Sequence, residues 1–308
     1  MGALFNAMPG AVAQGIIWGV MAIGVYITFK ILDIADLTVD GSFGTGGAVL
    51  VVCMTSGMNV FLALLIAMLA GCLAGLVTGI LHTKFGIPAI LAGILTQLAL
   101  YSINLRVMSG RANLPLPVQK FHLLLNLRNI PMAIIVAGIF AVIVIAALYW
   151  FFGTELGHSL RATGANQSMA RANGINTSTT KIIALVISNG IVALAGALLA
   201  QYQGFADVNM GRGAIVIGLA AVIIGEVIFG KIFNNFALRL LAAVFGGIIY
   251  YLVLQVVLWA GLNANDLKLF SAIVVALFLG IPYWKNQIAS RRTRPTSDGK
   301  GGTSSVRD

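Results

Sequence analysis

The feature that most constrains this chain is a series of long apolar runs that hold few charged side chains. A helix that crosses a membrane needs about 20 consecutive apolar residues, and the runs approach that length. They predict an all-α, polytopic membrane bundle of about nine spans, at residues 11–29, 43–54, 60–82, 89–105, 131–152, 181–202, 214–230, 240–262 and 267–284.

Composition agrees with a membrane protein and excludes several other classes. Hydrophobic residues make up 59% of the 308 residues and charged residues 9%, whereas soluble domains carry about 25% charged residues. So few charges cannot cover the surface of a soluble enzyme, and collagen-like and disordered chains are excluded as well. The net charge of +10 would indicate nucleic acid in a soluble chain. Here the bases lie between apolar runs and in the tail, so we expect membrane lipid and no nucleic acid.

The distribution of Lys and Arg predicts the domain organisation and the orientation. We expect a transmembrane domain over 1–284 and a basic, disordered cytoplasmic tail over 285–308. If loop 153–180 and this tail are cytoplasmic, thirteen bases lie inside and six outside. The positive-inside rule then predicts a plasma-membrane protein with its N-terminus outside and its C-terminus in the cytoplasm. Residues 1–29 hold no Lys or Arg, so we expect no cleaved signal peptide.

Two stretches interrupt the apolar pattern. Residues 31–47 hold three aspartates and four glycines, which predicts a broken helix. Residues 106–130 hold four bases on the side predicted to face outward, and a half-helix that dips into the membrane would fit there. The number of half-helices in 31–58 and 106–130 stays open. These interruptions distinguish the chain from a bundle of uniform spans.

A short internal similarity relates two parts of the chain. In each copy, at residues 34–41 and 204–211, a span leads into an Asp- and Gly-containing stretch that precedes another apolar run. In the predicted topology the first copy begins outside and the second begins inside. This arrangement predicts an inverted repeat, which many transporters use to build a pathway at the repeat interface.

Carboxylates at membrane depth are the first candidates for function in such a bundle. Asp36, Asp40 and Asp207 lie in or beside the broken stretches, and acids inside a membrane commonly serve a pathway or gate. The alternative is that each caps the N-terminus of a half-helix, where a carboxylate is favoured. Both interpretations stay open. Glu226 lies about one turn from Lys231, so we expect an interfacial ion pair there.

Other residue types favour packing over chemistry. Gly71, Gly75 and Gly79 lie on one helix face and predict a close-packing seam within the bundle. The two cysteines and three histidines are scattered, so we expect no disulfide, no metal site and no enzyme. The chain also has no phosphate-binding loop. A transporter of this kind therefore uses an ion gradient or a separate ATPase, and we expect no cofactor bound by this chain itself.

The loop 153–180 carries the most specific pattern. Asn166 is a favourable N-cap and Gly174 a favourable residue after a helix, which predicts a short helix over Asn166–Ala172 bracketed by Gly164 and Gly174. Its small residues would let it sit in a groove of another protein. The alternative is an ordinary basic cytoplasmic loop.

This loop resembles the coupling segment of ABC importer permeases of the branched-chain amino acid and ribose class. The matching positions are Gly157, Leu160, Arg161, Ala162, Thr163, Gly164, Asn166, Ala170, Gly174, Ile175 and Asn176. Arg171 departs from the family, which usually has a small residue there. The string Asp36–Phe43 resembles a less characterised subgroup, and Gly218–Gly230 resembles a region that often holds a Gly-Gly pair, replaced here by Gly225-Glu226. The resemblance spans about residues 11–283.

The resemblance implies an assembly and a set of contacts. Such permeases pair to form a pore, bind a cytoplasmic ATPase and receive substrate from an external binding protein, so ATP would act through the ATPase. Nothing in this chain calls for a different second subunit, so we expect a homodimer. The residues implied in ATPase coupling are Arg161, Gly164, Asn166, Ala170, Arg171 and Gly174.

The resemblance also narrows the cargo. The expected cargo is an amino acid, and a sugar or nucleoside is the alternative within the same class. An ion-coupled secondary transporter acting alone is the alternative from another class, although it would not need a docking segment. A membrane-embedded enzyme is disfavoured because no His, Asp or Cys cluster is visible in the sequence.

Overall fold

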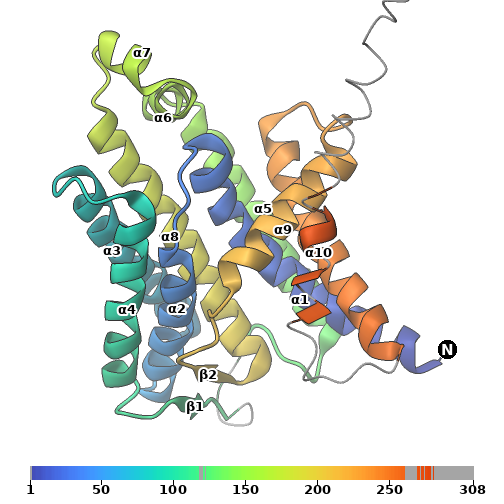
Figure 1. Ribbon diagram of the computed structural model, residues 1–308. Helices are drawn as coiled ribbons and strands as arrows, with labels where there is room; N and C mark the ends of the chain where they lie inside the picture. The colour runs from blue at the N-terminus through green and yellow to red at the C-terminus, as the bar shows by residue number, and fades with distance from the viewer. Residues whose placement is uncertain are drawn as a thin grey trace, which may run out of the picture.

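The structure, a computed structural model, is a helical bundle (Figure 1) and describes residues 2–117, 121, 123–260 and, apart from 271, 274 and 279, residues 269–280. Within these residues seven helical spans are long and apolar enough to cross a membrane. The helices are α1 (Gly2–Tyr26), continued by a π-helical turn (Ile27–Ile31), α2 (Thr38–Thr55), α3 (Val60–Thr83), α4 (Ala89–Val107), α5 (Ile130–Phe152), α6 (Glu155–Ala165), α7 (Gln167–Ala172), α8 (Thr177–Gln203), α9 (Ala214–Phe229) and α10 (Phe236–Trp259).

The all-α membrane bundle predicted from the apolar runs is confirmed, while the count of nine spans is not. The described part holds seven full-length spans and the shorter apolar helix α9. The described residues between 269 and 280 are helical, in the region of the ninth predicted span. The tail 285–308, together with the boundary predicted at 284, lies outside the described residues.

Helices α1 and α8 form the centre of the bundle. In their most apolar windows 83% and 78% of the residues are buried, against 28–39% for α3, α4, α5 and α10. Helix α8 packs against α2 and α3, and α1 packs against α10. The predicted glycine seam lies at one of these contacts, because a Cβ atom at Gly71 or Gly75 would collide with the backbone of α8. The prediction that this seam packs within the bundle is confirmed.

The break predicted at 31–47 is shorter than expected. The chain is irregular only over residues 32–37, and α2 already begins at Thr38. The Oδ1 atom of Asp36 accepts a hydrogen bond from the backbone N–H of Thr38 at 2.9 Å. This bond satisfies a donor that a helix start leaves free, so the helix begins five residues before the apolar run.

The half-helix that would fit in 106–130 is absent from the described residues of that segment. Helix α4 ends at Val107, and Ser109 and Gly110 follow with positive φ angles of 56° and 78°. The chain then forms a three-residue strand, β1 (Asn113–Pro115), which pairs antiparallel with β2 (Phe205–Asp207). The backbone of this segment thus bonds to a neighbouring strand, so it needs no helix to satisfy its polar groups.

The two ends of the bundle differ in what they carry. Figure 1 shows α6 and α7 together at one end, and the N-terminus with β1 and β2 at the other. Helices α2 and α9, which follow the two copies of the internal similarity, run towards opposite ends. The inverted repeat itself stays a prediction.

The predicted ion pair of Glu226 exists, but the expected partner was wrong. Glu226 pairs with Lys30 at 2.8 Å, and it forms no ion pair with Lys231. Lys231 is a close neighbour along the sequence, whereas Lys30 approaches through the fold, at the end of the span that begins the chain. The pair joins the end of α9 to the π-helical turn that continues α1.

Candidate coupling segment and membrane path

Helix α7 confirms the short helix predicted from the loop sequence. The side chain of Asn166 accepts a hydrogen bond from the backbone N–H of Met169 at 3.0 Å, as expected of an N-cap. Gly174 has a φ angle of +80°, a conformation that favours glycine after a helix end. The sequence did not predict α6, which occupies the preceding eleven residues and includes Gly164. Gly164 therefore lies within α6, and not in a loop before α7 as the sequence suggested.

Several contacts attach the pair α6–α7 to the bundle. The hydroxyl groups of Thr163 in α6 and Thr180 in α8 hydrogen-bond at 3.0 Å. The Nε of Arg171 in α7 donates to the hydroxyl of Thr177 at 3.0 Å. A Cβ atom at Gly164 would overlap the carbonyl oxygen of Ile31, so glycine lets α6 lie against the end of α1. A force on α7 would therefore reach both α8 and α1.

Not all of the residues predicted for ATPase coupling face outward. Asn166, Arg171 and Gly174 are exposed, whereas the side chain of Ala170 is buried, with 2% of its surface exposed. Helix α7 also presents Met169, which is 61% exposed and which sequence reasoning missed. The sequence does mark Met169, because it is the large apolar side chain in a short helix whose other residues are small or polar.

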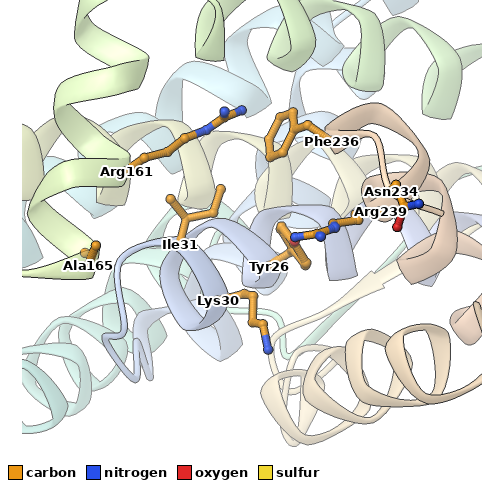
Figure 2. Close-up of a pocket in the computed structure, with 9 residues that line it drawn as sticks. Tyr26, Lys30, Ile31, Arg161, Ala165, Asn234, Phe236 and Arg239 are labelled. Carbon is orange, nitrogen blue, oxygen red and sulfur yellow. The ribbon is translucent and has the colours of Figure 1, made fainter. Parts of the chain in front are cut away.

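Arg161 is exposed, but its guanidinium group contacts aromatic rings of the bundle. Its guanidinium carbon is 4.4 Å from the ring centroid of Phe236 and 5.2 Å from that of Phe152. Figure 2 shows the side chain reaching from α6 towards Phe236 at the start of α10. Arg161 therefore joins α6 to the body of the bundle.

Asp36 is bound into the core between α2 and α8. It is 2% exposed, and its Oδ2 accepts a hydrogen bond from the Nδ2 of Asn189 at 2.7 Å. The Oδ1 of Asn189 in turn accepts from the hydroxyl of Ser42 at 2.7 Å. Together with the bond from Thr38, the first residue of α2, these contacts tie the irregular linker to both α2 and α8.

Asp40 and Asp207 also accept hydrogen bonds from backbone donors. The carboxylate of Asp40 accepts from the N–H groups of Gly213 and Ile215, both at 2.9 Å, so it lies at the N-terminus of α9, where negative charge is favoured. Asp207 accepts from the N–H of Asn209 at 2.7 Å and stabilises the turn after β2. The three acids thus do not gather at a single point.

A cavity of about 310 Å³, into which several polar side chains project, lies beside Asp40, between α2, α4 and the start of α9. Arg212 brings a positive charge to it, and Gln97, Tyr101 and Asn104 line it from α4. Asn104 is 2% exposed, and its Oδ1 has no hydrogen-bond partner in the described part of the chain. The cavity therefore offers a negative charge from Asp40, a positive charge from Arg212 and a hydrogen-bond acceptor on Asn104.

Sequence reasoning identified only Asp40 among these cavity residues. The spacing of three other lining residues could have indicated the cavity. Gln97, Tyr101 and Asn104 follow one another after four and three residues, so they share one face of a helix. Within the described residues no group of three or more His, Cys, Asp or Glu side chains could hold a metal ion. Cys53 and Cys72 are free thiols.

Several proteins resemble this chain along most of their length. The Tyrosine transport system permease protein of Clostridioides difficile is 43% identical over 89% of this chain and 90% of its own length. An uncharacterized protein of Rickettsia prowazekii is 36% identical over 89% of this chain and 97% of its own. The Autoinducer 2 import system permease protein LsrC of Yersinia pseudotuberculosis is 30% identical over 67% of this chain and 58% of its own.

A solved structure and a family match complete the comparison. PsaBC from Streptococcus pneumoniae in complex with Fab contains a chain with a TM-score of 0.52 and 17% identity, covering 91% of this chain and 94% of that one, a likeness of fold alone. Residues 8–282 match the family described as Branched-chain amino acid transport system / permease component. A match over so much of the sequence shows that this chain belongs to that permease family.

Proposed function

We propose that this permease carries amino acids, with an aromatic amino acid such as tyrosine as the leading cargo. The observation that carries the proposal is the 43% identity to a tyrosine transport system permease over about nine-tenths of both chains. The autoinducer 2 permease is less similar and matches only 67% of this chain. A sugar or nucleoside cargo is therefore the second candidate.

The proposed coupling runs from a separate ATPase through α7. Met169 and Arg171 are the exposed side chains of α7 best suited to a groove on that partner. Arg171 also bonds to Thr177, so movement of the docked helix is transmitted to α8. ATP acts on the partner, and this chain needs no bound cofactor or catalytic group of its own.

The proposed membrane path passes the cavity beside Asp40. An amino acid carries both an ammonium and a carboxylate group. Asp40 and the free Oδ1 of Asn104 suit the ammonium, because a carboxylate oxygen that accepts one hydrogen bond can accept another. Arg212 suits the carboxylate. The cavity volume of about 310 Å³ lies at the lower end of the ~300–1,000 Å³ typical of small-molecule sites.

The proposed assembly is a homodimer with N-termini outside and C-termini in the cytoplasm. In this orientation α6 and α7 face the ATPase, while β1 and β2 face an external substrate-binding protein. The observation that supports this orientation is that the N-terminus and α7 lie at opposite ends of the bundle (Figure 1). Native mass spectrometry of the assembled transporter should show two copies of this chain with two ATPases. One copy beside a different permease would contradict the homodimer.

Uptake measurements test the cargo directly. A strain lacking this chain should lose uptake of labelled tyrosine and recover it when the chain is restored. Leucine, tryptophan, ribose and a nucleoside serve as comparison solutes. Loss of ribose or nucleoside uptake with amino acid uptake intact would replace the leading proposal with the second one.

A charge placed on α7 tests the coupling. Met169→Glu puts a carboxylate on the exposed apolar position, so substrate-stimulated ATP hydrolysis should fall at least tenfold while the protein still folds. Ser178→Glu adds the same charge at the exposed start of α8, where an acid is tolerated, and should leave hydrolysis unchanged. Equal hydrolysis in wild type and Met169→Glu would refute docking through α7.

A further inference from the structure

A second polar cavity, of about 440 Å³, lies at the end of the bundle that carries α6 and α7. The π-helical turn after α1, one face of α6 and the start of α10 border it (Figure 2). Three of its lining residues are bases: Lys30, Arg161 and Arg239. Because they come from three separate elements, they form a pocket of positive charge rather than a run along one helix.

Two of these positive charges lack a carboxylate partner. Lys30 is paired with Glu226. Among the described residues neither Arg161 nor Arg239 forms an ion pair. Arg161 lies over aromatic rings, and Arg239 lines the cavity together with Tyr26. Figure 2 shows the two guanidinium groups reaching into the cavity from opposite sides. Like charges repel, so an anion between them is favoured.

The chemistry of these groups favours a phosphate over a simple anion such as chloride. Guanidinium groups match phosphate oxygens with paired hydrogen bonds. Helix α10 also begins at the cavity without a side-chain cap, because Asn235 makes no capping hydrogen bond. The free N–H groups and the dipole of this helix start add to the attraction that the two arginines provide.

The height of the cavity in the bundle points to a lipid as the source of that phosphate. The span that begins at Ala7 ends at Ile31, and Arg239 lies in the first turn of α10, so the cavity is level with the ends of two spans. Phospholipid headgroups lie at that level. Phe29 and Ile232, close along the sequence to the lining residues Lys30 and Asn234, are 36% and 70% exposed, which suits acyl chains.

We propose that this cavity binds the phosphate group of an anionic phospholipid such as phosphatidylglycerol, held by Arg161 and Arg239. The bound headgroup joins α6, the helix that precedes α7, to the end of the first span and to the start of α10. The inference rests on the cavity and its charges and does not depend on which solute the permease carries.

Lipid titration of the purified chain tests the proposal. After delipidation in detergent, phosphatidylglycerol should raise the Tm and remain bound in native mass spectrometry, and phosphatidylcholine should do neither. Arg239→Gln should weaken phosphatidylglycerol binding roughly tenfold, as expected when one charged hydrogen-bonding partner is removed. Arg239→Lys should recover part of the loss. Lys84→Gln, which removes an exposed charge outside the cavity at the same end of the bundle, should leave binding unchanged.

Several results would overturn the assignment. Equal binding of the two lipids, or equal weakening by Arg239→Gln and Lys84→Gln, would mean diffuse attraction to the surface. Displacement of phosphatidylglycerol by inorganic phosphate or ATP at matched concentrations would assign the site to a free phosphate instead. Loss of ATPase association in Arg239→Gln with unchanged lipid binding would assign the cavity to a protein carboxylate.

Discussion

Helices α4 and α5 are equally exposed, yet their side chains suit different surroundings. In each, 28% of the residues in the most apolar window are buried. The exposed middle of α5 is wholly apolar, with Ile139, Val142 and Ile143 more than half exposed. Helix α4 instead carries Gln97 and Tyr101 beside the polar cavity. Polar side chains inside a membrane normally face a path or another protein rather than lipid.

In an isolated chain, a side chain that faces lipid and a side chain that faces a path both have exposed surface. The polar residues of α4 and the apolar residues of α5 distinguish the two cases. On α5, where the exposed residues in the middle of the helix are all apolar, we expect lipid contact. On α4, exposure next to Asp40 and Arg212 indicates a surface that in our proposal meets the substrate. Exposure alone therefore does not assign a face of a membrane helix, and the polar side chains have to be considered with it.

The largest expected effect comes from a charge at the centre of each helix. Val142 in α5 and Leu98 in α4 are 63% and 64% exposed, which makes them a matched pair. Val142→Arg places a charge in lipid and should cost roughly 2.5–3.5 kcal/mol of insertion free energy. Leu98→Arg places it in the proposed path and should allow insertion. Membrane-fraction yield measures both, and equal losses would remove the distinction between α4 and α5.

A smaller effect should separate Asp36, which is bonded inside the core, from Asp207, which is bonded in a turn. Asp36→Ala removes a buried partner of Thr38 and Asn189, so stability should fall by about 1.5–3 kcal/mol. Asp207→Ala removes only a local turn bond and should change stability by less than about 0.5 kcal/mol. Thermal unfolding in detergent measures the two variants. An unchanged Tm for Asp36→Ala would show that Asp36 does not hold α2 to α8.

Arg212 should affect transport without affecting the fold. Arg212→Gln removes the proposed partner of the substrate carboxylate, so the KM for tyrosine uptake should rise roughly tenfold, the size of one charged hydrogen bond. Arg128→Gln, an exposed arginine outside the cavity lining, is the matched control and should transport as wild type. An unchanged KM for Arg212→Gln would place the path elsewhere.

The parts of this molecule that were predicted from sequence are those set by local chemistry. The apolar runs predicted α3 and α5 to within one residue at each end, because length and polarity define a span. Helix α7 was predicted because Asn166 and Gly174 act on their own neighbours.

The parts that were missed depend on residues far apart in the chain. The pairing of β1 with β2, the bond from Asn189 to Asp36 and the ion pair of Lys30 with Glu226 each join distant segments. Sequence proximity suggested Lys231 for Glu226 and misled, because the fold supplied a closer base. The cavity beside Asp40 was missed for the same reason, since α4 and the start of α9 meet only in the fold.

Thiol accessibility tests most directly whether α4 faces a water-filled path and α5 faces lipid. In a background without the native thiols (Cys53→Ala, Cys72→Ala), Tyr101→Cys and Ile139→Cys replace residues that are 42% and 52% exposed. In membranes containing the assembled transporter, a charged thiol reagent should label Tyr101→Cys, the transported amino acid should protect it, and Ile139→Cys should stay unlabelled. Labelling of Ile139→Cys with Tyr101→Cys unreactive would contradict the account.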